Sequence, residues 1–516
     1  MNYPWLTTIG AVPLVGAAAV ALLPRAFAPR ARHLALVVSL LTFGLTVAAA
    51  LQFDVSGGLT ESGFQLTEQH QWIPQFGVSY AVGVNGIGLV MVALSTVLVP
   101  VCVLAAWNEV DADRARSFFA LMLVLETSMI AIFAARDLFL FYVVFEAMLI
   151  PVYFLIGRFG GPRRSYAAVK FLIYSLAGGL IMLVAVIGLY AAGPGGEQGF
   201  MISNLTGLEF SSTAAERLMF IGFFIAFAIK APMWPVHTWL PDAAAEAPAS
   251  VSVLLVGVLD KVGTFGMLTL CLPMFPDASR WAAPVILALA VVSVLYGALL
   301  AIGQSDLKRL IAYTSISHFG FIVLGIFAMT SAGQSGSTLY MVNHGFSTAA
   351  LFLVAGMLIA RRGGSAAIED YGGLQRSTPL LAGGFLLAGL SSLALPGMSS
   401  FISEFLVLTG TFTEYPAVAV LATLGIVLAA LYILLTYQRM FTGPAKEYAA
   451  GWRDVNLREA WVIAPLVAVI VALGFFPKPV LDVINPAISR TMQDTGSTDP
   501  APTVEGATTA ETGGAR

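Results

Sequence analysis

About fourteen stretches of roughly 20 apolar residues follow one another along the chain, and each is long enough for an α-helix that crosses the hydrocarbon core of a bilayer. Of the 516 residues, 58% are hydrophobic and 11% are charged, whereas a soluble domain carries about 25% charged residues. The sequence therefore predicts an all-α, polytopic membrane protein. The expected spans lie near residues 5–23, 33–53, 81–106, 117–135, 137–157, 166–192, 218–240, 248–272, 281–303, 307–330, 339–360, 379–414, 417–440 and 460–476.

Basic residues are distributed unevenly between the two sets of loops that these spans would create. Eighteen of the 26 Lys and Arg residues fall on one side and six on the other, while Lys230 and Lys261 lie inside spans. Loops rich in Lys and Arg stay in the cytoplasm, so we expect both termini on the non-cytoplasmic side. A signal peptide has a basic start. The first apolar stretch lacks one, so we interpret it as a retained span.

Sequence motifs for common cofactors are absent. Cys102 and Cys271 both lie in apolar stretches, so no disulfide framework is indicated. The chain contains no zinc-ligand spacing, Walker loop, GxGxxG element or CxxCH haem site. We therefore expect no cofactor and no metal in this chain, and no nucleic acid partner.

Several ionisable side chains lie within the predicted spans, where they are costly and usually mark a path for ions or protons. Both basic residues inside spans are lysines, although 20 of the 26 basic residues are arginines. A buried lysine can lose its proton and an arginine cannot, so Lys230 and Lys261 are predicted to titrate. Alternatively, a lysine reaches the membrane surface with its long side chain, and a histidine makes a structural hydrogen bond. The candidates are Glu126, Glu146, Lys230, Asp260, Lys261, His318, His344 and Glu404, of which His344 is closer to a span end.

Two of the predicted spans, the seventh and the twelfth, contain residues that break helices. Pro232 and Pro235 follow Lys230, and Pro396 with Gly397 precedes Glu404. Proline removes a backbone donor, and such a break is tolerated at membrane depth only where protein or water covers the freed groups. Paired broken spans indicate inverted repeats and a transport site. We expect two inverted five-helix repeats, helices 4–8 and 9–13, although two unrelated kinks are the alternative.

This interpretation divides the chain into five segments. The first three helices occupy residues 1–116, and the first repeat occupies 117–272. The second repeat occupies 273–442, and helix 14 with its flanks occupies 443–493. Residues 494–516 are rich in Thr, Gly, Ala and Glu, which predicts a disordered tail.

Four stretches resemble the antiporter-like membrane subunits of respiratory complex I, the proton-pumping NADH:quinone oxidoreductase. They are ARDLFLFYVVFEAMLIPVYFLIG (135–157), FAIKAPMWPVHTWLPDAAAEAPAS (227–250), SDLKRLIAYTSISHFGFIVLG (305–325) and LALPGMSSFISEFLVL (393–408). The first and fourth resemble the chain M branch, the counterpart of mitochondrial subunit 4. Glu404 also resembles chain M, because chains L and N typically carry Lys there.

The resemblance implies roles for the residues that match the family's motifs. Glu146 and Lys230 resemble its coupled acid–lysine pair, Lys261 and His318 its central hydrophilic axis, and His344 a nearby relay histidine. Glu404 resembles the terminal proton-transferring residue. His237 would belong to the relay or make a structural hydrogen bond. The chain departs from the family at Ala244, where His is frequent, and at Asn85, where Asp is common.

The implied function is proton translocation by a membrane subunit of complex I in the bacterial plasma membrane, coupled to quinone reduction elsewhere. NADH, FMN, iron–sulfur clusters and quinone would be bound by other subunits. The expected partners are the neighbouring chains L and N, lipids and protons. Alternatives are a cation/proton antiporter subunit of the Mrp type, a module of a membrane hydrogenase, and a scaffold that transports nothing.

Overall fold

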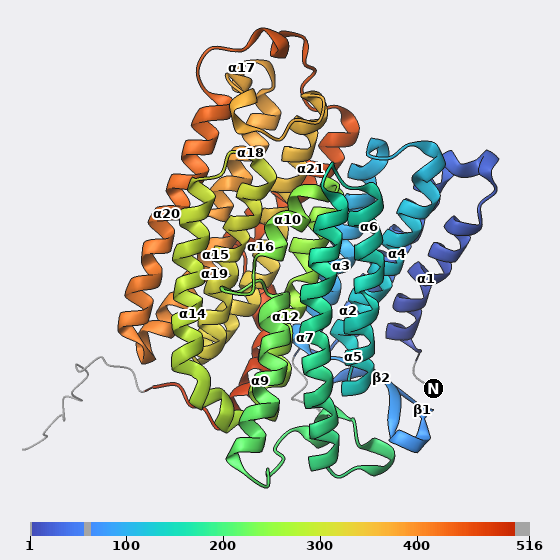
Figure 1. The fold of residues 1–516 in the computed structure, drawn as a ribbon, viewed down its shortest axis with the longest axis vertical. Helices are drawn as coiled ribbons and strands as arrows, with labels where there is room; N and C mark the ends of the chain where they lie inside the picture. Colours follow the sequence, from blue (N-terminus) through green and yellow to red (C-terminus); the bar gives the residue numbers. More distant parts are fainter. Residues whose placement is uncertain (1–2, 56–62, 501–516) are drawn as a thin grey trace, which may run out of the picture.

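The computed structural model describes residues 3–55 and 63–500, which form an elongated helical bundle with a β-hairpin at one end (Figure 1). The main helices of the first half are α1 (Trp5–Leu22), α2 (Ala31–Ala50), α3 (Gly86–Ala105), α4 (Ala112–Ala134), α5 (Leu138–Ala147), α6 (Leu149–Phe159), α7 (Arg164–Ala192), α9 (Thr213–Lys230), α10 (Trp239–Glu246), α11 (Ala249–Leu254), α12 (Lys261–Gly266) and α13 (Leu272–Met274). Those of the second half are α14 (Pro276–Ile302), α15 (Leu307–Phe327), α16 (Ser331–Arg361), α18 (Pro379–Ser392), α19 (Ser399–Glu414), α20 (Pro416–Phe441), α21 (Leu457–Phe475) and α22 (Lys478–Asp494).

Twelve helical stretches in the described part of the chain are long and apolar enough to cross a membrane. This confirms the prediction of a helical, polytopic membrane protein. The other two predicted spans, near 218–240 and 379–414, are each divided into two shorter helices, α9 with α10 and α18 with α19. The count of fourteen spans and the inverted repeats stay predictions.

The first interruption lies between α9 and α10, where residues 231–238 leave the helix. Pro232 and Pro235 fall in this segment, and a proline has no N–H with which to continue the helical ladder. The freed carbonyl of Ile229 accepts a hydrogen bond from the indole N–H of Trp239, at 2.9 Å. The Trp239 side chain therefore supplies a hydrogen bond to a backbone carbonyl that would be costly to leave unpaired inside a membrane.

Gly263 of α12 packs directly against this interruption. A Cβ at position 263 would lie 2.4 Å from the carbonyl oxygen of Phe227 and 2.6 Å from the backbone nitrogen of Ala231. Both are backbone atoms that cannot rotate away, so a side chain at this position would push α9 and α12 apart. Lys261 lies two residues before Gly263, so the helix that carries Lys261 contacts the interruption that follows Lys230.

The second interruption separates α18 from α19 and includes Pro396 and Gly397. Gly397 has a φ of 89°, which is in the left-handed region that glycine adopts without strain. The side-chain amide of Asn343, on α16, donates a hydrogen bond to the carbonyl of Ser399 at 2.6 Å. A neighbouring helix thus supplies a donor close to the start of α19.

The β-hairpin was not predicted. Strand β1 (Gln65–Ile73) pairs antiparallel with β2 (Val78–Val84). The prediction that a span begins near residue 81 is wrong, because β2 occupies that position and α3 begins at Gly86. The side chain of Asn85 caps α3 by accepting a hydrogen bond from the amide of Gly88, at 2.9 Å. This capping role accounts for Asn85 in structural terms.

Helix α22 follows the last predicted span and was also missed. Its mean hydropathy is too low for a span, and its apolar side chains cover one face only, which is buried against the bundle. The two ends of the described chain lie at the hairpin end of the bundle (Figure 1). Of the predicted tail, residues 501–516 lie outside the described residues, while the Asp499 carboxylate accepts a hydrogen bond from the Ser331 amide at 2.8 Å.

Asp242 links its own helix, α10, to α7 and α15. Its carboxylate accepts a hydrogen bond from Lys170 of α7 at 2.7 Å and another from Arg309 of α15. Burial alone would raise the pKa of Asp242, but the two cations hold that pKa below its usual value of 3.8. A carboxyl with a lowered pKa stabilises the folded state above its unfolded pKa and loses that contribution as pH falls through its folded pKa.

We expect Asp242→Asn to lower the stability of the protein at neutral pH by about 1–3 kcal/mol, because two charge-assisted hydrogen bonds are weakened. Thermal unfolding in detergent measures the effect, which should shrink as the pH falls below 3.8 and disappear below the lowered pKa of Asp242. Asp277→Asn is the matched control, because Asp277 forms an exposed ion pair with Arg280 and such pairs contribute little. Equal melting temperatures for the Asp242→Asn variant and the parent at neutral pH would contradict the prediction.

Candidate functional site

Lys230 is the last residue of α9, and its side chain is completely buried. Its Nζ lies 5.1 Å from the centre of the Phe145 ring and 5.8 Å from that of Phe171. Within the described chain, Nζ has no hydrogen-bond partner. Two carboxylates, those of Asp260 and Glu146, are near enough for their charges to act on this ammonium group. Lys230 can therefore gain or lose its proton without breaking a direct salt bridge.

Glu146 lies near the end of α5 and is only partly buried. Its Oε1 is buried and has no hydrogen-bond partner in residues 3–55 and 63–500. The carboxylate packs against α7 at Gly179, where an added Cβ would lie 1.5 Å from Oε1. The predicted pair, Glu146 and Lys230, is thus brought within electrostatic reach but is not joined by a hydrogen bond.

Lys261 begins α12, between two π-helical segments, η5 (Leu255–Leu259) and η6 (Met267–Cys271). Its Nζ donates a hydrogen bond to the carbonyl of Val256 at 2.6 Å and lies 2.6 Å from Nδ1 of His344. An ammonium group can only donate. When Lys261 is protonated, Nδ1 of His344 is therefore the acceptor and the proton of a neutral His344 is on Nε2.

His344 and His318 lie side by side on α16 and α15. Their ring centres are 5.2 Å apart and the rings are perpendicular. Nε2 of His318 is 3.0 Å from the hydroxyl of Tyr432 on α20. The expectation that His344 is close to the end of its span is wrong, because α16 starts at Ser331 and ends at Arg361. His344 therefore lies in the middle of that helix.

A tyrosine, Tyr340, lies between Glu404 on α19 and the two histidines. The hydroxyl of Tyr340 donates a hydrogen bond to Glu404 Oε2 at 3.4 Å. The Tyr340 ring centre is 5.8 Å from that of His318. The structure thus brings four of the predicted residues into one buried line, which runs through Lys261, His344, His318 and Glu404. We call this line the central polar line.

Tyr340 and Tyr432 complete the central polar line, and neither was predicted from the sequence. The predicted residues are groups that ionise easily, whereas tyrosine has an ordinary pKa near 10. Tyr340 precedes His344 by four residues, and helix residues at that spacing share a face. The spacing could have indicated Tyr340. The sequence around Tyr432 carries no comparable signal, because its partner lies on another helix.

Three predicted residues are buried outside the central polar line. Both carboxylate oxygens of Asp260 and of Glu126, and both ring nitrogens of His237, have no hydrogen-bond partner in the described part of the chain. Asp260 still interacts electrostatically with both lysines. His237 lies in the first interruption with its ring 5.2 Å from that of Tyr296.

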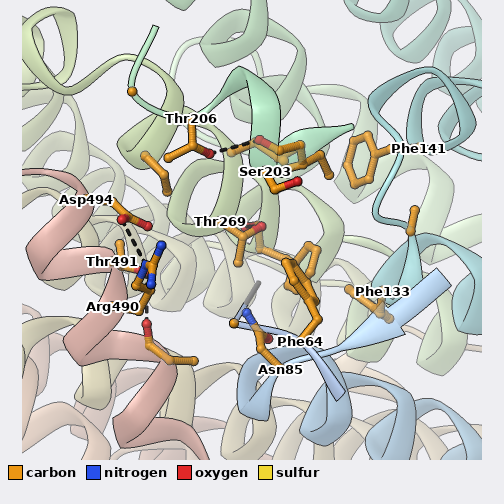
Figure 2. A pocket seen from close by; sticks show the side chains of 18 residues that line it. Phe64, Asn85, Phe133, Phe141, Ser203, Thr206, Thr269, Arg490, Thr491 and Asp494 are labelled. Carbon is orange, nitrogen blue, oxygen red and sulfur yellow. Dashed lines mark hydrogen bonds and ion pairs between the residues drawn. The ribbon is translucent and has the colours of Figure 1, made fainter. Parts of the chain in front are cut away.

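A cavity of about 310 Å³ lies at the hairpin end of the bundle. Figure 2 shows Arg490, Thr491 and Asp494 on one side of it and the rings of Phe133 and Phe141 on the other. The predicted proton-transfer residues do not line this cavity. The Phe141 ring contacts those of Phe145 and Phe227. These aromatic rings separate the cavity from Lys230.

A helical bundle with two interrupted spans and a buried line of Lys, His, Tyr and Glu defines an antiporter-like membrane subunit. Residues 135–429 match the family described as "NADH:quinone oxidoreductase/Mrp antiporter, TM". The chain is 49% identical to NADH-quinone oxidoreductase subunit M of Mycobacterium tuberculosis H37Rv, over 98% of this chain and 96% of the relative. It is 38% identical to subunit M of Escherichia coli K12, over 88% and 92%. The chain belongs to the subunit M family of NADH-quinone oxidoreductases.

Solved structures with the same fold agree with this assignment. A chain of respiratory complex I from Thermus thermophilus with bound NADH superposes with a TM-score of 0.84 and 32% identity, over 94% of this chain and 99% of that chain. A chain of the Mrp complex from Dietzia sp. DQ12-45-1b superposes with a TM-score of 0.83 and 23% identity, over 96% and 100%. The second likeness concerns the fold alone. The predicted chain M branch is confirmed.

Proposed function

We propose that this chain translocates protons in the membrane domain of an NADH-quinone oxidoreductase and uses the central polar line as the path. The observation that carries this proposal is the row of buried polar side chains from Lys261 to Glu404, which hydrogen bonds join at its two ends and which has ring-centre separations of 5.2 and 5.8 Å around His318. Lysine, histidine and carboxylate side chains that lie inside a membrane and contact one another form proton relays. Side chains that served only to stabilise the fold would not need to be ionisable groups inside the membrane.

The first half of the path consists of Glu146, Lys230 and Asp260. Two unit charges about 6 Å apart at an effective dielectric constant near 20 interact by roughly 3 kcal/mol. A change of that size shifts a proton equilibrium by about a hundred-fold. A charge that appears on Glu146 would therefore favour a protonated Lys230, and its loss would favour release of the proton.

The second half carries the proton from Lys261 towards Glu404. The Nζ–H of Lys261 donates its proton to Nδ1 of His344, which then releases the proton on its Nε2. His318 and the hydroxyls of Tyr340 and Tyr432 stand between that nitrogen and the Glu404 carboxylate. A hydrogen bond spans about 3 Å, so water completes the wider gaps.

The chain supplies the proton path, and the oxidation and reduction steps belong to other subunits. NADH, FMN, iron–sulfur clusters and quinone are expected there, since this sequence carries none of their binding motifs. Neighbouring antiporter-like chains L and N would cover the partly exposed Glu146. We place the chain in a bacterial plasma membrane with both termini on the non-cytoplasmic side, as the distribution of Lys and Arg indicates.

Lys261→Met and Glu404→Gln test this proposal in the assembled complex. We expect each variant to reduce NADH-driven proton pumping by about a hundred-fold or more, because each removes a group that transfers a proton. NADH oxidation with an artificial electron acceptor reports how much complex is assembled. Lys478→Met is the control, because Lys478 is exposed and pairs only with Asp482 on α22 among the described residues. Parent-like pumping in both test variants would refute the proposed path.

A further inference from the structure

The buried face of α7 between Phe171 and Gly179 contacts both members of the acid–lysine pair. Phe171 faces the ammonium of Lys230, with 5.8 Å between Nζ and the ring centre. Gly179 lies against the carboxylate of Glu146. Residues eight apart on an α-helix are separated by about 12 Å along its axis and share a face. This face therefore forms a wall that extends from the lysine to the glutamate.

Ser175 lies midway along this wall, four residues from each end. Its side chain is 2% exposed, and its hydroxyl has no hydrogen-bond partner in the residues that the structure describes. Serines buried in helices usually bond to the carbonyl four residues earlier, as Ser95 does with Met91 at 2.8 Å. A buried hydroxyl without a partner is costly. A role in connecting the two ionisable groups on either side of it, Glu146 and Lys230, would explain why this cost is tolerated.

Gly179 determines where the Glu146 carboxylate lies. A Cβ at this position would be 1.5 Å from Oε1 and 2.6 Å from Cδ of Glu146. The conflict involves the end of a flexible side chain and no backbone atom, so a larger residue would displace the carboxylate while α7 stays in place. Gly178, next to it, faces Ile229 and Ala226 of α9 instead.

We propose that Ser175 and Gly179 are positioning residues of the first half of the path. Gly179 holds the Glu146 carboxylate against α7, and the Ser175 hydroxyl connects that carboxylate with Lys230 through water. The inference rests on the proposed function, because it assigns new residues to the same path.

The transfer through Ser175 conserves protons. An N–H bond of the Lys230 ammonium breaks as its proton bonds to an intervening water, and that water gives one of its own protons to Ser175 Oγ. The original Oγ–H bond breaks at the same time, and a second water passes a proton on in the same way, so that an O–H bond forms on the Glu146 carboxylate. The serine hydroxyl is unchanged, the lysine becomes neutral and the glutamate becomes a neutral acid. The reverse transfer uses the same bonds.

Ser175→Thr and Ser175→Val test the hydroxyl, because the two new side chains have nearly the same shape and only threonine keeps the hydroxyl. In membrane vesicles with the assembled complex, we expect Ser175→Val to pump about five-fold more slowly than Ser175→Thr. We also expect a larger ratio of pumping rates in H₂O and D₂O for Ser175→Val, which a purely structural effect would not produce. Equal rates and equal isotope ratios in the two variants would overturn the role of Ser175.

Gly179→Ala tests the position of the carboxylate. We expect pumping to fall about ten-fold or more, since a displacement of about 1 Å at a reacting group is enough for such a loss. Gly188→Ala is the matched control on the same helix, where the new Cβ would contact the flexible Met219 side chain at 3.0 Å. Parent-like pumping in Gly179→Ala would overturn this part of the inference.

Pumping by the Lys230→Met variant, measured in parallel, distinguishes a failure of the positioning roles from a failure of the proposed function. If Lys230→Met stops pumping while the Ser175 and Gly179 variants pump normally, the positioning residues are wrong and the proposed function stands. If Lys230→Met pumps normally, the proposed function fails, and the inference fails with it.

Discussion

Lys230→Arg should reduce NADH-driven proton pumping about ten-fold or more, although it keeps the positive charge. The guanidinium group stays protonated under all physiological conditions, so it cannot release the proton that the first half of the path must pass on. The ammonium of Lys230 has no hydrogen-bond partner in the described structure, so its role is not that of a fixed structural cation. Pumping rates of membrane vesicles, normalised to the amount of assembled complex, measure the effect.

Lys170→Arg provides the comparison for this experiment. Lys170 forms an ion pair with Asp242 at 2.7 Å, and an arginine can satisfy a carboxylate at least as well. We expect this variant to pump like the parent. A Lys230→Arg variant that assembles and pumps at the parent rate would show that position 230 needs only a positive charge. A side chain that can release its proton would then not be required there.

The double variant Tyr340→Phe with Tyr432→Phe should also reduce pumping about ten-fold or more, because it removes both hydroxyls between His318 and Glu404. Each single variant should have a smaller effect, since the other tyrosine still offers a hydroxyl. The relevant contacts are 3.0 Å from Tyr432 to His318 and 3.4 Å from Tyr340 to Glu404. The same vesicle assay measures all three variants.

Tyr437→Phe is the control for the tyrosine variants. Tyr437 lies on the same helix as Tyr432, and its ring stacks on that of Phe441. Removal of the Tyr437 hydroxyl should leave the pumping rate unchanged. If the double variant pumps like the Tyr437→Phe variant, the proton passes from His318 to Glu404 without the tyrosines.

The helical architecture was predictable because hydrophobic length is a strong local signal. The starts of α4, α7 and α20 lie within about five residues of the starts of the predicted spans. The hairpin and α22 were missed for a different reason. Strand β1 is polar and mostly exposed, while β2 is almost entirely buried and its sequence continues into the apolar stretch of α3. Helix α22 buries one face only, so it produces no long apolar stretch.

The composition of the candidate site was predictable, but its connections were not. Charged residues inside spans are visible in the sequence, which is why Lys230, Lys261 and Glu404 were named. The contact between Lys261 and His344 joins residues 83 positions apart, and no spacing rule reports such a pairing. Ser175 shows the same limit, because the role that we propose for it depends on what the neighbouring helices place beside it.

The interruption after Lys230 also bears on how fast the subunit can work. Its freed carbonyl, that of Ile229, is already bonded to the Trp239 indole, so the helix does not have to unwind in each cycle. Rearrangements of helices take microseconds to milliseconds, whereas side-chain rotations take picoseconds to nanoseconds. A permanent interruption therefore leaves only the fast movements of side chains and water at this step, and the slow step of turnover is expected elsewhere in the complex.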